Sequence, residues 1–290
     1  MSDFSRITVV SVTGLQAVAS GALSAIELSM QQLPGSRGLL ISPARPAGMQ
    51  DRVRHIQVRP FGYLEYSIFI LYSLGQFIET EFALVVQDDG WAVDSRNWRP
   101  EFFDYDYLGA PIHLARVYQH DQPVFRRGFS WVEDVLRGAR VDNIFNGGFS
   151  LRSKKLLDAP RSLRIPFQIP VPSISADAPH AMQWDGDEVN EDVWLCLCAR
   201  QVLERAGVKF PPLDIAKRFS IEHAAPLLHS RESVRHIFGH HSKMRKIADE
   251  SRKIIRYEAS RELAASTYGE AWIADWLRDV GYRIHWPSDD

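Results

Sequence analysis

The chain has 290 residues, of which 45% are hydrophobic and 24% are charged. Its 34 lysines and arginines nearly balance its 36 aspartates and glutamates, so the formal net charge is −2. A chain of this length can bury a substantial core, and its balanced charge excludes an overall field that would attract nucleic acid or an anionic membrane. The two cysteines, Cys196 and Cys198, suit neither a structural zinc site nor a disulfide framework.

The N-terminus favours a cytoplasmic protein. Residues 1–6 lead directly into the β-branched run 7–12, without the basic start and apolar stretch of a secretory signal. The most apolar stretch, residues 68–86, is interrupted by Gln76 and two glutamates, which is too polar for a transmembrane helix of about 20 residues. The sequence therefore predicts no transmembrane segment.

The first ninety residues alternate strand and helix patterns. Residues 7–12 predict a strand, 17–33 a helix and 38–42 a second strand, which together form the β-α-β opening typical of a parallel sheet. Residues 63–77 predict another helix. Residues 82–86 predict a strand that is apolar on both faces and therefore belongs in the centre of the sheet.

The pattern is looser beyond Trp91. The predicted elements are a short strand at 105–110, a loop with some helix at 121–140, a strand at 145–151 interrupted by paired glycines, a helix from 153, a proline-rich loop at 166–179, a helix from Asn190 or Glu191 through Val202, and a highly charged helix at 243–265. The basic residues of the last helix could contact an anionic membrane surface, although its acidic residues favour a solvated face.

Two adjacent carboxylates, Asp88 and Asp89, follow the predicted central strand. Ligands of open α/β sheets bind outside the carboxyl ends of the strands, and such carboxylates suit Mg²⁺ or Mn²⁺. The alternative is a simple turn, in which an Asp side chain bonds to nearby backbone and Gly90 takes a positive φ. Trp91 is close to Asp89 in sequence and could stack on a sugar bound there, although a packing role is the commoner one.

Three further signals are weaker. Gly147 and Gly148 would let the backbone approach a ligand closely, or would form a bulge in the sheet. Residues 185–194 are acidic and precede or begin a helix, where capping is a sufficient explanation but where one carboxylate could also act as a base. The pair His240 and His241 could complete a metal site, although a surface pair is the commoner case.

Together and in this order, these motifs resemble the GT-A nucleotide-diphospho-sugar transferases, and most closely a poorly characterised microbial family of glycosyltransferases catalogued as a domain of unknown function. The resemblance spans roughly residues 7–241. It implies an α/β, Rossmann-like fold with a mostly parallel central sheet flanked by helices. It also implies a GT-A-like domain at residues 1–241 and a helical C-terminal extension at 242–290 packed on the same domain.

The resemblance also implies roles for individual residues. These are Asp89 and His240 as ligands of Mn²⁺ or Mg²⁺, Thr13, Asp88, Gly147 and Gly148 in donor binding, Trp91 and Glu191 in acceptor binding, and Asp192 as the catalytic base. Gly90 stands where the second acidic residue of a DxD motif would be, which leaves open whether Asp88 or Asp89 binds the metal. His240, in a Phe-Gly-His setting, fits the closing histidine of such enzymes better than His241.

The expected activity is metal-dependent transfer of a sugar from a nucleotide-sugar donor, of UDP or GDP type, to the hydroxyl of a carbohydrate or glycoconjugate acceptor. A base at Asp192 predicts a single displacement with inversion, although retention stays open. Surface polysaccharide synthesis would suit this activity. The alternatives are a sugar-phosphate nucleotidyltransferase, disfavoured because the loop after the first strand is not basic, and a carbohydrate- or partner-binding protein without catalysis.

Overall fold

The N-terminal β-branched run forms a buried strand within the main sheet. In the computed structural model, which describes residues 3–120, 122–184, 189–267 and 269–287, this strand is β1 (Ile7–Val12). Helix α1 (Ala19–Gln32) connects it to the parallel strand β2 (Arg37–Ser42). The fully buried strand β4 (Phe82–Val85) pairs in parallel with the other side of β1. The predicted β-α-β opening and buried strand are therefore confirmed.

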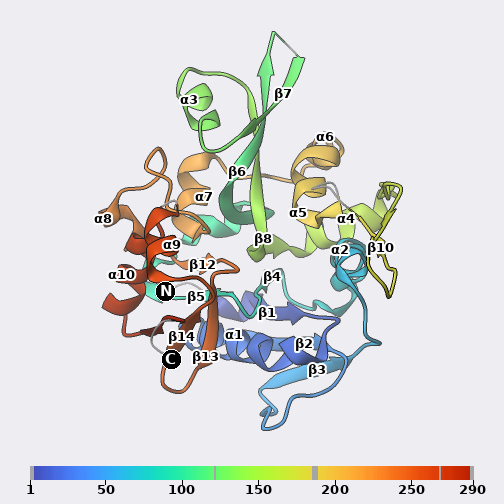
Figure 1. Cartoon of the computed structure of the whole chain (residues 1–290). Coiled ribbons are helices and arrows are strands. Elements are labelled where there is room, and N and C mark those ends of the chain that lie inside the picture. The colour runs from blue at the N-terminus through green and yellow to red at the C-terminus, as the bar shows by residue number, and fades with distance from the viewer. Residues whose placement is uncertain (1–2, 121, 185–188, 268, 288–290) are drawn as a thin grey trace.

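The main sheet has seven strands in the order β3-β2-β1-β4-β8-β6-β7 and is mixed (Figure 1). Its remaining members are β3 (Val53–Gln57), β6 (Tyr107–Gln119), β7 (Gln122–Arg127) and β8 (Val141–Ser153). Pairing is parallel from β3 to β4 and antiparallel from β4 to β7. The expectation of a mostly parallel sheet is wrong, because β8 pairs antiparallel with both β4 and β6, and β6 pairs antiparallel with β7.

Helices cover both faces of the parallel half. Alternate residues of a strand point to opposite faces, so Val9 packs in the cluster that includes α1, and Val10 packs in a separate cluster. That second cluster contains residues of α2 (Tyr63–Tyr72) and of α4 (Lys154–Ser162). The parallel half is therefore a two-sided core, with strand ends that open toward a cavity.

A small second sheet lies beside the end of β4. It has the order β11-β12-β5 and consists of β11 (Ser220–Ile221), β12 (Gly239–His241) and β5 (Gly90–Ala92). Strands β11 and β12 are parallel, whereas β12 and β5 are antiparallel. This sheet brings the segment after Asp89 next to His240 and His241.

The C-terminal segment is a mixture of strands and helices, so the predicted helical extension is wrong. It contains β13 (Arg245–Asp249), β14 (Ile254–Tyr257), α9 (Arg261–Ser266), α10 (Glu270–Asp279) and β15 (Arg283–His285). Its basic residues lie largely on the β13–β14 hairpin, which removes the basis for a membrane-binding basic helix. No helix within the described ranges is long and apolar enough to cross a membrane.

The remaining elements lie mainly around β6 and β8. They are α3 (Trp131–Leu136), β9 (Ser173–Ile174), β10 (Met182–Gln183), α5 (Glu191–Val193), a π-helical turn (Trp194–Cys198), α6 (Arg200–Arg205), α7 (Leu213–Phe219) and α8 (Arg231–Val234). The helix expected from Asn190 or Glu191 begins at Glu191, with Asn190 as its N-cap residue. Residues 185–188 of the acidic run are outside the described residues.

Candidate active site

Asp88 and Asp89 are the central residues of a tight turn between β4 and β5. The backbone N–H of Gln87 donates to the carbonyl of Gly90 over 3.2 Å, and the N–H of Gly90 donates back over 3.0 Å. A Cβ on Gly90 would lie 2.9 Å from the carbonyl oxygen of His240, so the position requires glycine. The turn is therefore present, but Gly90 is required by its close approach to His240 and not by the positive φ that was expected. The turn also places both carboxylates at the carboxyl end of β4.

A cavity of about 510 Å³ lies at this end of the sheet. Residues 11–15, which end β1 and follow it, form one part of its wall, and Thr13 is among them. Phe61 and Tyr63 contribute aromatic side chains, while Gln87, Asp88 and Asp89 contribute polar groups. The structure therefore brings Thr13, Asp88 and Asp89 together, although the first is distant from the others in sequence.

His241, not His240, lies against the carboxylates. Nε2 of His241 is 3.2 Å from Oδ1 of Asp89 and 3.2 Å from Oε1 of Gln87. His240 points to the opposite face of β12, where its ring lies 4.1 Å from the Trp91 ring. The choice of His240 as a metal ligand does not fit this structure, because neighbouring residues of a strand face opposite sides.

The carboxylates and His241 form an electrostatic cluster. Burial would favour the neutral imidazole, but the charge of Asp89 and its hydrogen bond raise the pKa of His241 to about 9. Burial would likewise favour protonated Asp89, yet His241 holds the pKa of Asp89 below its ordinary value. Burial and the charge of Asp89 raise the pKa of Asp88, which Lys246 opposes from 3.8 Å. Near neutral pH, Asp89 and His241 are therefore an ion pair.

Trp91 is fully buried and cannot stack on an acceptor sugar in this conformation. Its indole N–H donates a 2.8 Å hydrogen bond to the hydroxyl of Tyr282, and its ring contacts His240. Burial also lowers the pKa of His240 well below its ordinary value, so this ring is neutral. Trp91 and His240 therefore belong to the core beneath the site, which corrects the acceptor-binding role expected for Trp91.

Gly147 and Gly148, within β8, separate two groups of polar side chains. A Cβ on Gly148 would lie 2.3 Å from Nε2 of His241, and a Cβ on Gly147 would lie 2.3 Å from Oε1 of Glu191. Side chains at these positions would displace His241 or Glu191. The paired glycines thus allow the Asp89–His241 cluster and helix α5 to approach β8 from two sides.

Asp192 is bound to the backbone of this glycine pair. Its Oδ2 accepts a 3.0 Å hydrogen bond from the N–H of Gly147, and its Oδ1 accepts one of 2.7 Å from the N–H of Val193. Burial and the nearby charge of Glu191 raise the pKa of Asp192 from an ordinary value of 3.8 to about 7. A carboxyl group with this pKa is suited to general acid–base chemistry near neutral pH.

Glu191 is buried and pairs with Arg152 across 2.9 Å, with side-chain exposures of 4% and 1%. The same guanidinium donates to the carbonyl of Gly147 and to the hydroxyl of Ser150. Glu191 is therefore occupied in the interior and is not available to an acceptor. This corrects the acceptor-binding role that the resemblance had implied. Its partner Arg152 is a β8 residue that the sequence analysis did not select.

Three other polar residues at the site were missed. Oε1 of Glu222 lies 3.9 Å from Nδ1 of His241, and Oε2 of Glu222 accepts a 3.3 Å hydrogen bond from Asn146. Lys243 and Lys246 contribute to the cavity wall from the C-terminal segment. Glu222 follows the short strand β11 as Asp88 follows β4, and this position after a strand could have indicated it as a site residue. No such pattern indicated the two lysines, because their segment was expected to be helical.

Asp88 and Asp89 fit a divalent cation only in part. Among the described residues, no group of three or more His, Cys, Asp or Glu side chains is arranged to hold a metal. Mg²⁺ is, however, commonly held by one or two carboxylates together with substrate phosphates and water. The two adjacent carboxylates at the cavity suit this second arrangement and do not form a complete metal centre.

Sequence comparison gives a family but no activity. No curated protein matches the sequence. Residues 65–241, which are more than half of the chain, match the family described as protein of unknown function (DUF5672). This matched region contains the carboxylate pair, the paired glycines, Asp192 and His241, but not the β1 side of the cavity. The chain therefore belongs to the DUF5672 family.

Proposed function

We propose that the protein is a glycosyltransferase that uses a nucleotide-diphosphate-sugar donor. The observation that carries the proposal is the cavity of about 510 Å³, which joins the loop after β1, aromatic side chains and the carboxylates after β4. Its size is within the range of about 300–1,000 Å³ typical of small-molecule sites. Its place outside the carboxyl ends of parallel strands is where open α/β sheets bind ligands.

The aromatic and the acidic residues of the lining suit two parts of such a donor. Phe61, whose N–H donates to the carbonyl of Gly14, and Tyr63 offer aromatic side chains to a nucleobase. Asp88 and Asp89 would hold Mn²⁺ or Mg²⁺ jointly with the diphosphate. The ion would stabilise the negative charge that develops on the leaving nucleoside diphosphate. Lys246, 3.8 Å from Asp88, offers a further positive charge to the same phosphates.

Asp192 is the proposed base. It would accept the proton of the acceptor hydroxyl as that oxygen bonds to the anomeric carbon and the bond to the nucleoside diphosphate breaks. The pKa of about 7 allows Asp192 to be deprotonated before the reaction and still basic enough to take the proton. This single displacement inverts the anomeric carbon, and the configuration of the product would test it.

Ligand-dependent thermal stability tests the donor site. We expect one of UDP, GDP, CMP and dTDP to raise the melting temperature, and to do so only with Mn²⁺ or Mg²⁺. Saturation at a hundred times the Kd adds about 2.7 kcal/mol of stability. Asp89→Asn should abolish this effect because it removes one of the two carboxylates. Asp94→Asn is the matched control, since Asp94 pairs with Arg96 and does not line the cavity.

Other outcomes would redirect the proposal. If none of the nucleotides stabilises the protein, the donor site is wrong, and binding of glycans without turnover becomes the leading function. If a nucleoside triphosphate and a sugar phosphate release pyrophosphate, the enzyme is a nucleotidyltransferase. Metal-dependent stabilisation that persists in Asp89→Asn would remove Asp89 as a metal ligand, and stabilisation that does not need the metal would remove the metal from the mechanism.

A further inference from the structure

The small sheet carries opposite charges at its two ends. Asp89 precedes β5, Glu222 follows β11 and His241 ends β12, so these residues gather at one end. The pairing of β12 with the parallel β11 and the antiparallel β5 brings three other residues to the opposite end. These are Arg218, which is two residues before β11, His236, which precedes β12, and Arg99, which lies beyond β5.

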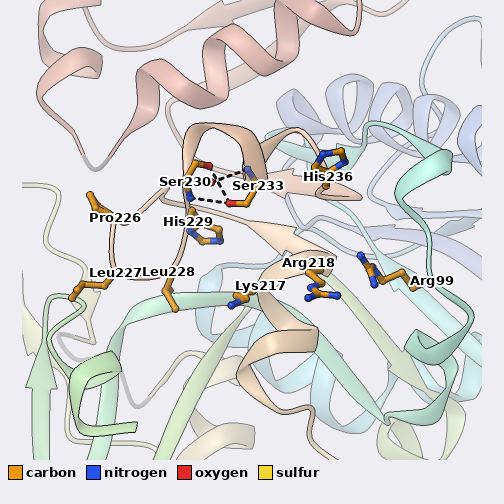
Figure 2. Close-up of a pocket in the computed structure, with 10 residues that line it drawn as sticks. All are labelled: Arg99, Lys217, Arg218, Pro226, Leu227, Leu228, His229, Ser230, Ser233 and His236. Carbon is orange, nitrogen blue, oxygen red and sulfur yellow. Dashed lines mark hydrogen bonds between the residues drawn. The ribbon is translucent and has the colours of Figure 1, made fainter. Parts of the chain in front are cut away.

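A second cavity, of about 550 Å³, lies at this cationic end. It is lined by Arg99, Lys217, Arg218, Pro226, Leu227, Leu228, His229, Ser230, Ser233 and His236 (Figure 2). This set contains three permanent cations and no Asp or Glu. Glu222 is four positions after Arg218, which is roughly 13 Å of extended strand at about 3.3 Å per residue. The second cavity shares no lining residue with the proposed donor site and is distinct from it.

The cations of this cavity are incompletely neutralised. Within the described ranges, Arg218 forms no ion pair with a carboxylate, and the nearest carboxylate contact of Arg99 is with Glu101 at 3.5 Å. Lys217 pairs with Asp214, whose side chain is 77% exposed. In Figure 2 the guanidinium groups of Arg99 and Arg218 point toward each other. Two like charges that converge on one space are stabilised by an anion between them.

Neutral polar groups complete the wall. His229 is buried, and burial lowers its pKa to about 4, so the ring is neutral at physiological pH and can donate one hydrogen bond and accept another. The hydroxyl of Ser233 donates to the carbonyl of Ser230, and the hydroxyl of Ser230 accepts from the N–H of Ser233 (Figure 2). Ser230 therefore keeps its own hydroxyl proton for a ligand. Forked guanidinium groups with such a donor match the several oxygens of a phosphate better than the single plane of a carboxylate.

We infer that this cavity is a binding site for a phosphate group, either a phosphomonoester or a diphosphate, held between Arg99 and Arg218. Lys217 adds positive charge on the side of His229. The neighbouring apolar residues Pro226 and Leu227, of which Leu227 is 47% exposed, would contact the uncharged part of the ligand. This site does not depend on the proposed glycosyltransferase activity.

Calorimetric titration of the full-length protein tests the site, with inorganic phosphate and pyrophosphate as probes at constant ionic strength. Arg218→Gln and Arg99→Gln should each weaken binding about tenfold or more, because each removes a charge-assisted hydrogen bond. Arg205→Gln is the matched control, since Arg205 is exposed on α6 and forms no ion pair in the part of the chain that the structure describes. Its binding should equal that of the wild type.

Two further measurements identify the source of the phosphate. Phosphatidylcholine vesicles with and without phosphatidic acid would identify a lipid headgroup, whereas glycerol 3-phosphate would identify a soluble ester. Binding that survives both Arg99→Gln and Arg218→Gln, or is weakened equally in Arg205→Gln, would overturn the inference. So would the absence of binding to the phosphates, the ester and the acidic vesicles alike.

Discussion

Two buried arginine–glutamate pairs flank the candidate active site, and they resemble each other closely. Arg152 pairs with Glu191 on one side, and Arg245 pairs with Glu270 on the other, with all four side chains at most 4% exposed. Each guanidinium also donates to a backbone carbonyl of the site. Arg152 reaches Gly147 over 3.3 Å, and Arg245 reaches His241 over 3.1 Å.

The difference between the pairs is in what lies beside the glutamate. Glu270 accepts a second hydrogen bond, of 2.8 Å, from the hydroxyl of Tyr257, so its charge is held by two donors. Glu191 is next to Asp192, and its charge helps to raise the pKa of that carboxyl. The same arrangement therefore fixes the position of one site strand and, on the other side, also adjusts the protonation of a proposed catalytic group.

The largest expected effect comes from breaking the Arg245–Glu270 pair. Arg245→Met should lower the free energy of unfolding by about 3–5 kcal/mol, because it leaves the charge of Glu270 buried without its main partner. Urea denaturation would measure this loss. The double change Arg245→Met, Glu270→Leu should recover much of it. A loss below about 1 kcal/mol in the single variant would show that the pair contributes little to stability.

Glu191→Gln should have a smaller effect on stability and a specific effect on titration. It weakens a charge-assisted hydrogen bond worth about 1.5–3 kcal/mol, but the amide oxygen of Gln can still accept from Arg152. It also removes the negative charge that raises the pKa of Asp192, so that pKa should fall below about 7. Arg245→Met should leave the pKa of Asp192 unchanged, and NMR titration of the carboxyl groups would compare the two variants.

The effect of Glu191 on Asp192 should also appear in how the free energy of unfolding changes with pH. The folded protein holds a proton on Asp192 up to about pH 7, whereas the unfolded chain loses it near the ordinary value of 3.8. Asp192 therefore favours folding at low pH, and this contribution falls as the pH rises between these values. Glu191→Gln should narrow that window, and Asp192→Asn should remove it. An unaltered profile in Asp192→Asn would contradict the raised pKa.

The smallest expected effect concerns the second donor to Glu270. Tyr257→Phe should reduce stability by only about 1 kcal/mol, since Arg245 remains to compensate the carboxylate. The same denaturation experiment would detect it. A loss as large as that of Arg245→Met would mean that the hydroxyl, not the guanidinium, is the main partner of Glu270.

The parts of the fold that sequence predicts are those with strong local patterns. The β-branched run of β1, the apolar strand β4 and the helix from Glu191 are all set by neighbouring residues. The position of Asp88 and Asp89 follows from β4 for the same reason. The antiparallel half was missed because the direction in which β6, β7 and β8 run depends on their pairing with other strands. The local residue pattern does not show that pairing.

The errors at the site have a different cause. Whether His240 or His241 faces Asp89 depends on the register of β12 against β5, about 150 residues earlier in the chain. The β13–β14 hairpin lacks a turn signal, because Lys253 takes a positive φ of 53° where glycine would be expected. Its lysines were therefore assigned to a helix, and their contribution to the cavity could not be foreseen.

The fully buried Arg245 also bears on where this protein could be divided. The region shared with the DUF5672 family, residues 65–241, excludes Arg245 and the strand β1. A fragment with these limits would leave β4 with one unpaired side, and an unpaired hydrophobic strand promotes aggregation. It would also lose the donor to the carbonyl of His241. The region matched by the family is therefore shorter than the segment that we expect to be needed for stable folding.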